Sequence, residues 1–139
     1  MIDRFIELIQ GRVTDPKFDQ AQREAVIDLL VWTMFADRHI ASTETERIEA
    51  EAKRMDWDSP TGVDIFIAQS MTRTRGVLGD DDKSESYLDD ISKRLGDTKS
   101  QHRAYKACLL LANVDGQIAP QEKDLLRRIA HRFGLDSDE

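Results

Sequence analysis

The stretch DQAQREAVIDLLVWTMF, residues 19–35, decides how this sequence folds. Its second half, AVIDLLVWTMF, is apolar on every side of a helix and includes Trp32. A helix that is apolar all round must be covered by other elements, because no face of it suits water. We therefore expect a central, buried helix from about residue 18 to residue 35.

The rest of the chain has helical periodicity and no alternating run of β-branched residues. Apolar residues recur at three- and four-residue spacing in the stretches 2–9, 42–56, 63–71 and 125–133. Aspartates begin the stretch 80–96 and basic residues stand near its end, as the helix dipole favours. The sequence predicts an all-α fold of about seven helices without a sheet.

Turn and capping residues set the expected helix ends. Ser59 with Pro60 suits the start of a fourth helix, and Gly79 suits its end. DTKS at 97–100 is expected to cap a sixth helix that ends in the apolar YKACLLLANV. Pro120 suits the start of the last helix, and Gly134 its end.

Length and composition bound the class of protein. The 139 residues suit one domain, 1–139, and three prolines with seven glycines favour helices over a turn-rich β fold. The net charge of −7 argues against nucleic-acid binding, which needs clustered Lys and Arg, and suits cations or a basic protein partner.

Cysteine usage and hydropathy indicate the compartment. The single cysteine, Cys108, lies in the apolar run ACLLLA, so we expect a buried structural thiol and no disulfide within the chain. No apolar run reaches the roughly 18 residues of a transmembrane helix. The start MIDRFIELIQGR lacks the order of a signal peptide, so we expect a cytoplasmic protein.

Two segments of the sequence repeat each other. ADRHIASTETERI (36–48) matches VDGQIAPQEKDLL (114–126), and each copy follows an apolar helix and leads into an amphipathic one. The matched pairs are Asp37 with Asp115, Ile40 with Ile118, Ala41 with Ala119, and Glu44 with Glu122. We expect two helical hairpins related by a pseudo-two-fold axis, with the fourth and fifth helices as connector.

The second copy also resembles a calcium-binding loop in part. Within ANVDGQIAPQE (112–122), Asn113, Asp115 and Glu122 stand where an EF-hand loop places its third, fifth and twelfth residues, but Leu111 replaces the first ligand. Three interpretations stay open: a purely structural turn, a turn with weak divalent binding, and a tight calcium site.

The candidate metal ligands carry oxygen, as calcium or magnesium prefers. They are Asp37, Glu44, Asn113, Asp115 and Glu122. Each loop supplies too few oxygens for the six to eight that calcium usually takes. We therefore expect affinity of about 10⁻⁴ M or poorer, unless the two loops converge or a partner supplies ligands.

Other kinds of site find little support in the sequence. His39, His102 and His131 are too far apart for a regular zinc motif, and the one cysteine is in an apolar run. There is no nucleophile elbow, phosphate-binding glycine loop or dinucleotide fingerprint. We expect no enzyme, although an enzyme without a recognisable motif stays as an alternative.

The segments FADRHIASTETE (35–46) and NVDGQIAPQEKDLLRRIAHRFGL (113–135), each following an apolar helix, resemble the TerB family of bacterial tellurite-resistance proteins. The resemblance covers most of the chain, from about residue 18 to 135. It implies a compact helical fold, an acidic surface able to bind metal, and a role in tellurite or chemical-stress response. The first copy departs from the pattern, with Arg38 in place of Gly116 and His39 in place of Gln117.

The resemblance makes Asp37, Glu44, Asp115 and Glu122 the positions of interest. The leading hypothesis is a non-enzymatic TerB-like interaction or sensor module that acts through a protein partner. The related TerB-like module also occurs in a membrane-anchored J-domain co-chaperone, so a place at the periphery of a membrane complex stays open. This sequence has no His-Pro-Asp signature of a J-domain, so co-chaperone activity is not implied. The alternatives are a dedicated metal-binding protein and, less favoured, a small enzyme.

Overall fold

The computed structural model describes residues 18–37, 46, 48–49, 52, 57, 59–112 and 120–135. These residues form five helices and no strand, which confirms the all-α class. The helices are α2 (Gln20–Asp37), α4 (Val63–Val77), α5 (Asp81–Leu95), α6 (Thr98–Ala112) and α7 (Pro120–Arg132).

The helix count differs from the expected seven. The first expected helix, residues 2–9, lies outside the described residues. The third, residues 42–56, lies largely outside them, although residues 46, 48, 49 and 52 are helical. The pairing of two equivalent hairpins therefore stays a prediction, as does the equivalence of Ile40 and Ile118, which lie outside the described part.

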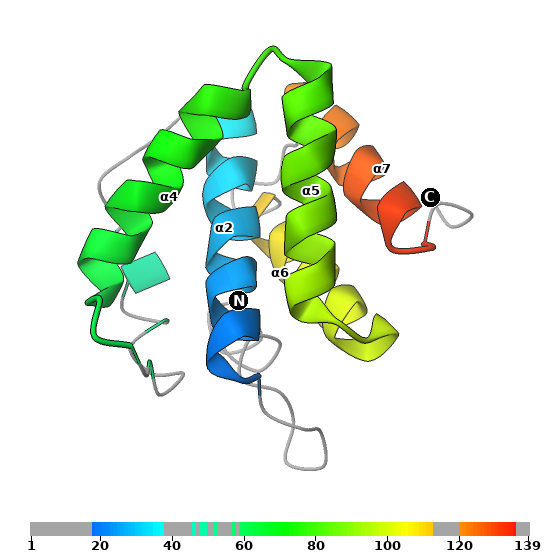
Figure 1. Cartoon of the computed structure of the whole chain (residues 1–139). Helices are drawn as coiled ribbons and strands as arrows, with labels where there is room; N and C mark the ends of the chain where they lie inside the picture. The colour runs from blue at the N-terminus through cyan, green and yellow to red at the C-terminus, as the bar shows by residue number, and fades with distance from the viewer. Residues whose placement is uncertain are drawn as a thin grey trace.

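Helix α2 runs through the middle of the bundle and contacts each of the other four helices (Figure 1). In Figure 1, α4 lies on one side of it, and α5 and α7 lie on the other. Every residue from Ala25 to Ala36 is buried. The expectation of a central helix, apolar on every side, is confirmed.

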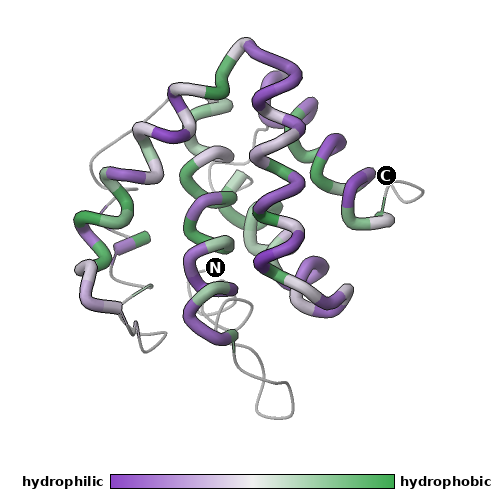
Figure 2. The backbone as a smooth tube through the Cα atoms, viewed as in Figure 1, coloured by the Kyte–Doolittle hydropathy of each residue, from purple (hydrophilic) through white to green (hydrophobic). Residues whose placement is uncertain are grey.

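The outer helices are amphipathic, as Figure 2 shows by the hydrophilic and hydrophobic stretches that alternate along α4, α5 and α7. Their buried faces join α2 in one cluster. From α5 come Leu88, Ile91 and Leu95; from α6 Ala104, Ala107, Cys108 and Leu111; and from α7 Leu125, Leu126 and Ile129. No described helix is at once long and apolar enough to span a bilayer.

Aspartates cap two helices at their N-termini. The Asp80 side chain accepts a hydrogen bond from the Lys83 backbone N–H at 3.0 Å, at the start of α5. Asp97 does the same for α6, accepting from the Ser100 N–H at 2.7 Å. That backbone hydrogen bond is the largest cause of the lowered pKa of Asp97. The cap expected within residues 97–100 is thereby confirmed.

The start of α4 was predicted wrongly. The helix begins at Val63 and not at Ser59 or Pro60, and its N-cap, Gly62, has no side chain to bond a free N–H. Ser59 instead accepts a hydrogen bond from the Thr61 N–H at 3.1 Å. The Trp57 indole N–H donates to the Thr61 carbonyl at 2.8 Å. These bonds fold residues 59–61 into a bend that precedes the helix.

Two glycines offer a matched test of backbone conformation. Gly96 ends α5 with a φ of +83°, where an L side chain is strained, whereas Gly76 lies inside α4. A Cβ at either position meets nothing within 4 Å, so only the backbone distinguishes them. Gly96→Ala is expected to lower the free energy of unfolding by about 1–2 kcal/mol.

Gly76→Ala is expected to raise the free energy of unfolding by at most about 0.5–1 kcal/mol, the range for a helix interior, because alanine favours the helical backbone and Gly76 is the penultimate residue of α4. Urea denaturation followed by circular dichroism measures both changes. Equal effects of the same sign at the two positions would contradict the conformational explanation.

Candidate functional site

The predicted ligand residues lie only partly within the described chain. Asp37 is the last residue of α2, and Glu122 lies in the first turn of α7. Glu44, Asn113 and Asp115 fall outside the described residues, and so does the side chain of Asp37. The geometry of the two expected loops therefore stays a prediction, and Glu122 is the one ligand candidate whose surroundings are known.

Glu122 is buried, with 5% of its surface exposed. Its carboxylate lies where the N-terminal end of α7 carries partial positive charge, which stabilises a negative group. A buried carboxylate needs such compensation, because burial alone opposes its charge. This placement favours the structural role for Glu122 at the start of the helix over that of a solvent-facing ligand.

A groove of about 500 Å³ lies where the end of α2, the α4–α5 turn and the start of α7 meet. Ala36, next to Asp37, lines the groove, and so do Pro120 and Gln121, which precede Glu122. Described residues next to each of the two predicted loops therefore line the same groove. The sequence repeat gave no indication that the start of the first copy would lie beside the second.

The groove has an apolar interior and a charged rim. Trp32, Phe35, Leu78 and Leu125 line it. Trp32 and Phe35 belong to the buried core, whereas Leu78 is 45% exposed. The hollow therefore connects the core of the bundle to an apolar side chain at the surface.

The polar lining comes from α5 and α7. Asp81 and Asp124 are exposed carboxylates, and the third charged lining group is Arg128. Arg128 Nη2 pairs with Glu85 Oε2 at 2.8 Å, which offsets its charge and fastens α7 to α5. The rim of the groove is acidic as a result.

The described part of the chain offers no ready metal site. No group of three His, Cys, Asp or Glu side chains among those residues is arranged to hold an ion. Asp81 and Asp124 border the groove, but two exposed carboxylates are fewer ligands than a hard cation takes.

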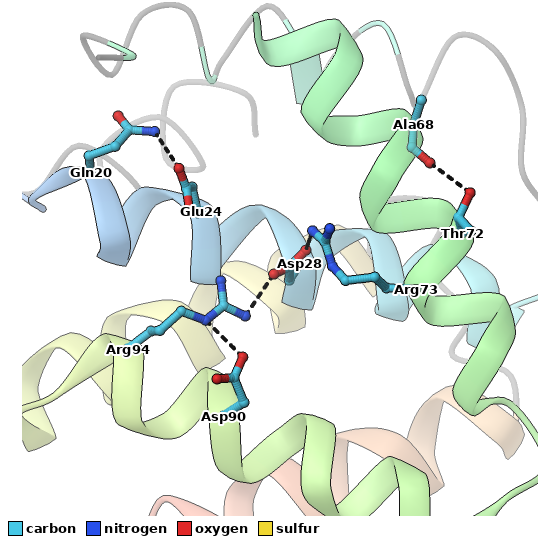
Figure 3. Close-up of polar contacts among 8 residues, drawn as sticks. All are labelled: Gln20, Glu24, Asp28, Ala68, Thr72, Arg73, Asp90 and Arg94. Atoms are coloured by element: carbon cyan, nitrogen blue, oxygen red, sulfur yellow. Dashed lines mark hydrogen bonds and ion pairs between the residues drawn. The ribbon is translucent and has the colours of Figure 1, made fainter. Parts of the chain in front are cut away.

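The charged cluster around Asp28 was missed at the sequence level. Asp28 is completely buried in α2, and its two oxygens accept hydrogen bonds from Arg73 of α4 at 2.8 Å and Arg94 of α5 at 2.7 Å (Figure 3). Arg94 also pairs with Asp90 at 3.0 Å. A single charged residue inside the run AVIDLLVW was the available signal for such a cluster.

Buried hydroxyl groups adjoin this cluster. Burial raises the pKa of Tyr87, and the negative charge of Asp28 adds to the rise. The hydroxyls of Tyr87, Ser70 and Thr74 are buried without a hydrogen bond of good geometry. Both oxygens of Asp28 accept hydrogen bonds from guanidinium groups, and its side chain has no exposed surface, so the carboxylate does not face solvent. The cluster joins α4 and α5 to the centre of the bundle.

Cys108 is buried in α6, as expected, and burial raises its pKa to about 12. At pH 8 a thiol of that pKa is ionised in only about one molecule in 10⁴, and the thiolate is the reactive form. We expect iodoacetamide to leave the native chain unmodified at pH 8 and to alkylate it fully in urea, as read by mass spectrometry. Rapid alkylation of the native chain would contradict the burial of this thiol.

Comparison with known proteins adds no assignment to this geometry. A scan against protein-family models, a search of curated proteins and a search of solved structures each find no match for the chain.

Proposed function

We propose that this chain is a non-enzymatic TerB-like interaction or sensor module of the cytoplasmic response to tellurite or related chemical stress. The observation that carries the proposal is the acidic-rimmed groove beside the described ends of the two repeated segments. The net charge of −7 and the exposed Leu78 suit a site that binds another protein. The stress-response role in this proposal is taken from the resemblance of residues 35–46 and 113–135 to the TerB family.

Growth of the native host tests the stress role. A strain lacking the gene is expected to grow less well than its parent in potassium tellurite, and a plasmid copy is expected to restore growth. The same strains grown with hydrogen peroxide show whether the response is specific to tellurite. Equal growth of both strains under every stress would refute the proposed role.

A dedicated metal-binding protein is the second candidate. It is favoured by one observation: Ala36, next to Asp37, and Gln121, next to Glu122, line the same groove. Convergence of the two loops would bring their carboxylates within reach of a single cation. In this alternative, calcium or magnesium would be the ligand and would control the choice of partner.

Calorimetry separates the two candidates. We expect any binding of calcium or magnesium to have a dissociation constant of about 10⁻⁴ M or poorer. At that affinity, 1 mM metal stabilises the native chain by at most about 1.4 kcal/mol. The control is Glu122→Gln, with its fold checked by circular dichroism. A micromolar site that this substitution abolishes would establish the metal-binding alternative.

A further inference from the structure

Leu78 is an unusual surface residue. Among the described residues, the exposed large hydrophobic side chains are Leu78 and Ile65, at 45% and 54%. Only Leu78 lines the groove, together with Trp32 and Phe35. Its apolar surface therefore continues into the core of the bundle, whereas Ile65 is exposed but does not line the groove.

The charged residues around the groove indicate which charge an occupant should carry. Asp81 and Asp124 line the rim, and Asp82 is exposed on the same end of α5. Asp124 also pairs with Arg127 at 3.9 Å, but both side chains are largely exposed, so water screens this pair. Arg128 is paired with Glu85, so its positive charge is already balanced. The charged groups that line the groove, Asp81, Asp124 and Arg128, carry a net negative charge, which attracts cationic groups and repels anionic ones.

The helix ends do not reverse this charge. Helices α5 and α7 both begin at the groove, and a helix N-terminus carries partial positive charge. Asp81 and Asp82 stand in the first turn of α5, and Glu122 in that of α7, where full negative charges exceed the partial positive ones. Lys83 follows these aspartates in α5, and Arg75 lies over the ring of the groove-lining Phe35 at 5.4 Å, but the lining carboxylates Asp81 and Asp124 outnumber the lining cation Arg128. The rim therefore favours cationic over anionic groups.

We infer that this groove binds a basic amphipathic segment of a partner protein, with a large apolar side chain between Leu78 and Trp32 and with Lys or Arg against Asp81 and Asp124. This inference rests on the proposed interaction function and names the class of its partner. A second copy of the chain fits poorly, because two chains of net charge −7 repel each other.

A peptide selection on the purified full-length chain tests the inference. A phage library of random 16-residue peptides is selected on the wild type and counter-selected on Leu78→Asp. The selected peptides are expected to combine a large apolar residue with a net positive charge. Selection of acidic peptides, or of peptides that bind both proteins alike, would overturn the inference.

Binding constants of one selected peptide, measured by fluorescence anisotropy, provide the matched controls. Leu78→Asp is expected to weaken binding about tenfold or more, whereas Ile65→Asp, at the other exposed apolar residue, leaves it unchanged. Asp81→Asn with Asp124→Asn is expected to weaken it about three- to tenfold at low salt, and Asp64→Asn is the charge control. Equal losses in target and control variants would contradict the proposed site.

Three further outcomes distinguish the explanations. A dimer seen by light scattering and dissociated by Leu78→Asp would show a second copy as the occupant and overturn the inference. Because the selection uses the purified chain, normal growth of the deletion strain under every stress tested would refute the stress role without changing the peptide result. Conversely, a growth defect restored equally by the wild type and by Leu78→Asp would support the stress role and refute partner binding in the groove as its basis.

Discussion

Replacing both Arg73 and Arg94 with methionine is expected to lower the free energy of unfolding by about 3–5 kcal/mol. The two guanidinium groups hold the two oxygens of Asp28, which is completely buried in α2 (Figure 3). Methionine keeps most of the apolar stem of arginine but not its charge. The double variant therefore leaves a buried carboxylate without its partners. Urea denaturation at pH 7, followed by circular dichroism, measures the loss.

The two single variants are expected to differ. The Arg94 side chain is 24% exposed and that of Arg73 is 40% exposed, so water screens the Arg73 pair more strongly. Arg94 is also held by Asp90, which orients its guanidinium toward Asp28. We expect Arg94→Met to lower stability more than Arg73→Met.

A triple variant separates a buried charge from lost packing. Replacing Asp28 with leucine as well removes the unpartnered carboxylate, and apolar replacement of a buried ion cluster is often neutral or stabilising. The triple variant is expected to recover most of the stability that the double variant loses. A triple variant as unstable as the double one would show that packing around the arginines, and not the charge of Asp28, holds α4 and α5 to α2.

The central helix and the caps could be predicted from local sequence. The run from Ala25 to Phe35 has no polar face, so its burial required no knowledge of its neighbours. Asp97 and Gly134 act within one turn of their own helices, and both were placed correctly. The start of α4 was missed because the bond from Trp57 to Thr61 competes with helix formation in a way that capping patterns do not reveal.

The ion cluster and the groove could not be predicted, because each joins distant parts of the chain. Asp28, Arg73 and Arg94 come from three helices, and no periodicity relates their positions. The groove likewise combines the end of α2, the α4–α5 turn and the start of α7. The repeat predicted Asp37 and Glu122 as site residues, which stays a prediction, and it did not indicate the apolar hollow lined by their neighbours Ala36 and Gln121.

Leu30→Ala is expected to lower the free energy of unfolding by about 2–5 kcal/mol. Leu30 is fully buried in α2, the helix that contacts all four other described helices. Removing its side chain takes apolar atoms from the core and leaves a cavity that rigid neighbours on every side cannot easily fill. A leucine on a one-sided helix faces a less confined space, so the effect here belongs in the upper part of that range.

Leu78→Ala provides the matched control, because the same atoms are removed from a side chain that is 45% exposed. Surface changes of this kind usually alter stability by less than about 0.5 kcal/mol. Both variants are compared by urea denaturation with tryptophan fluorescence, since Trp32 is a buried probe in the same helix as Leu30. Similar midpoints for the two variants would mean that α2 is not the structural centre of the bundle. A large loss at Leu30 alone would show that the apolar stretch within residues 19–35 stabilises the whole bundle, including the groove that its last turn lines.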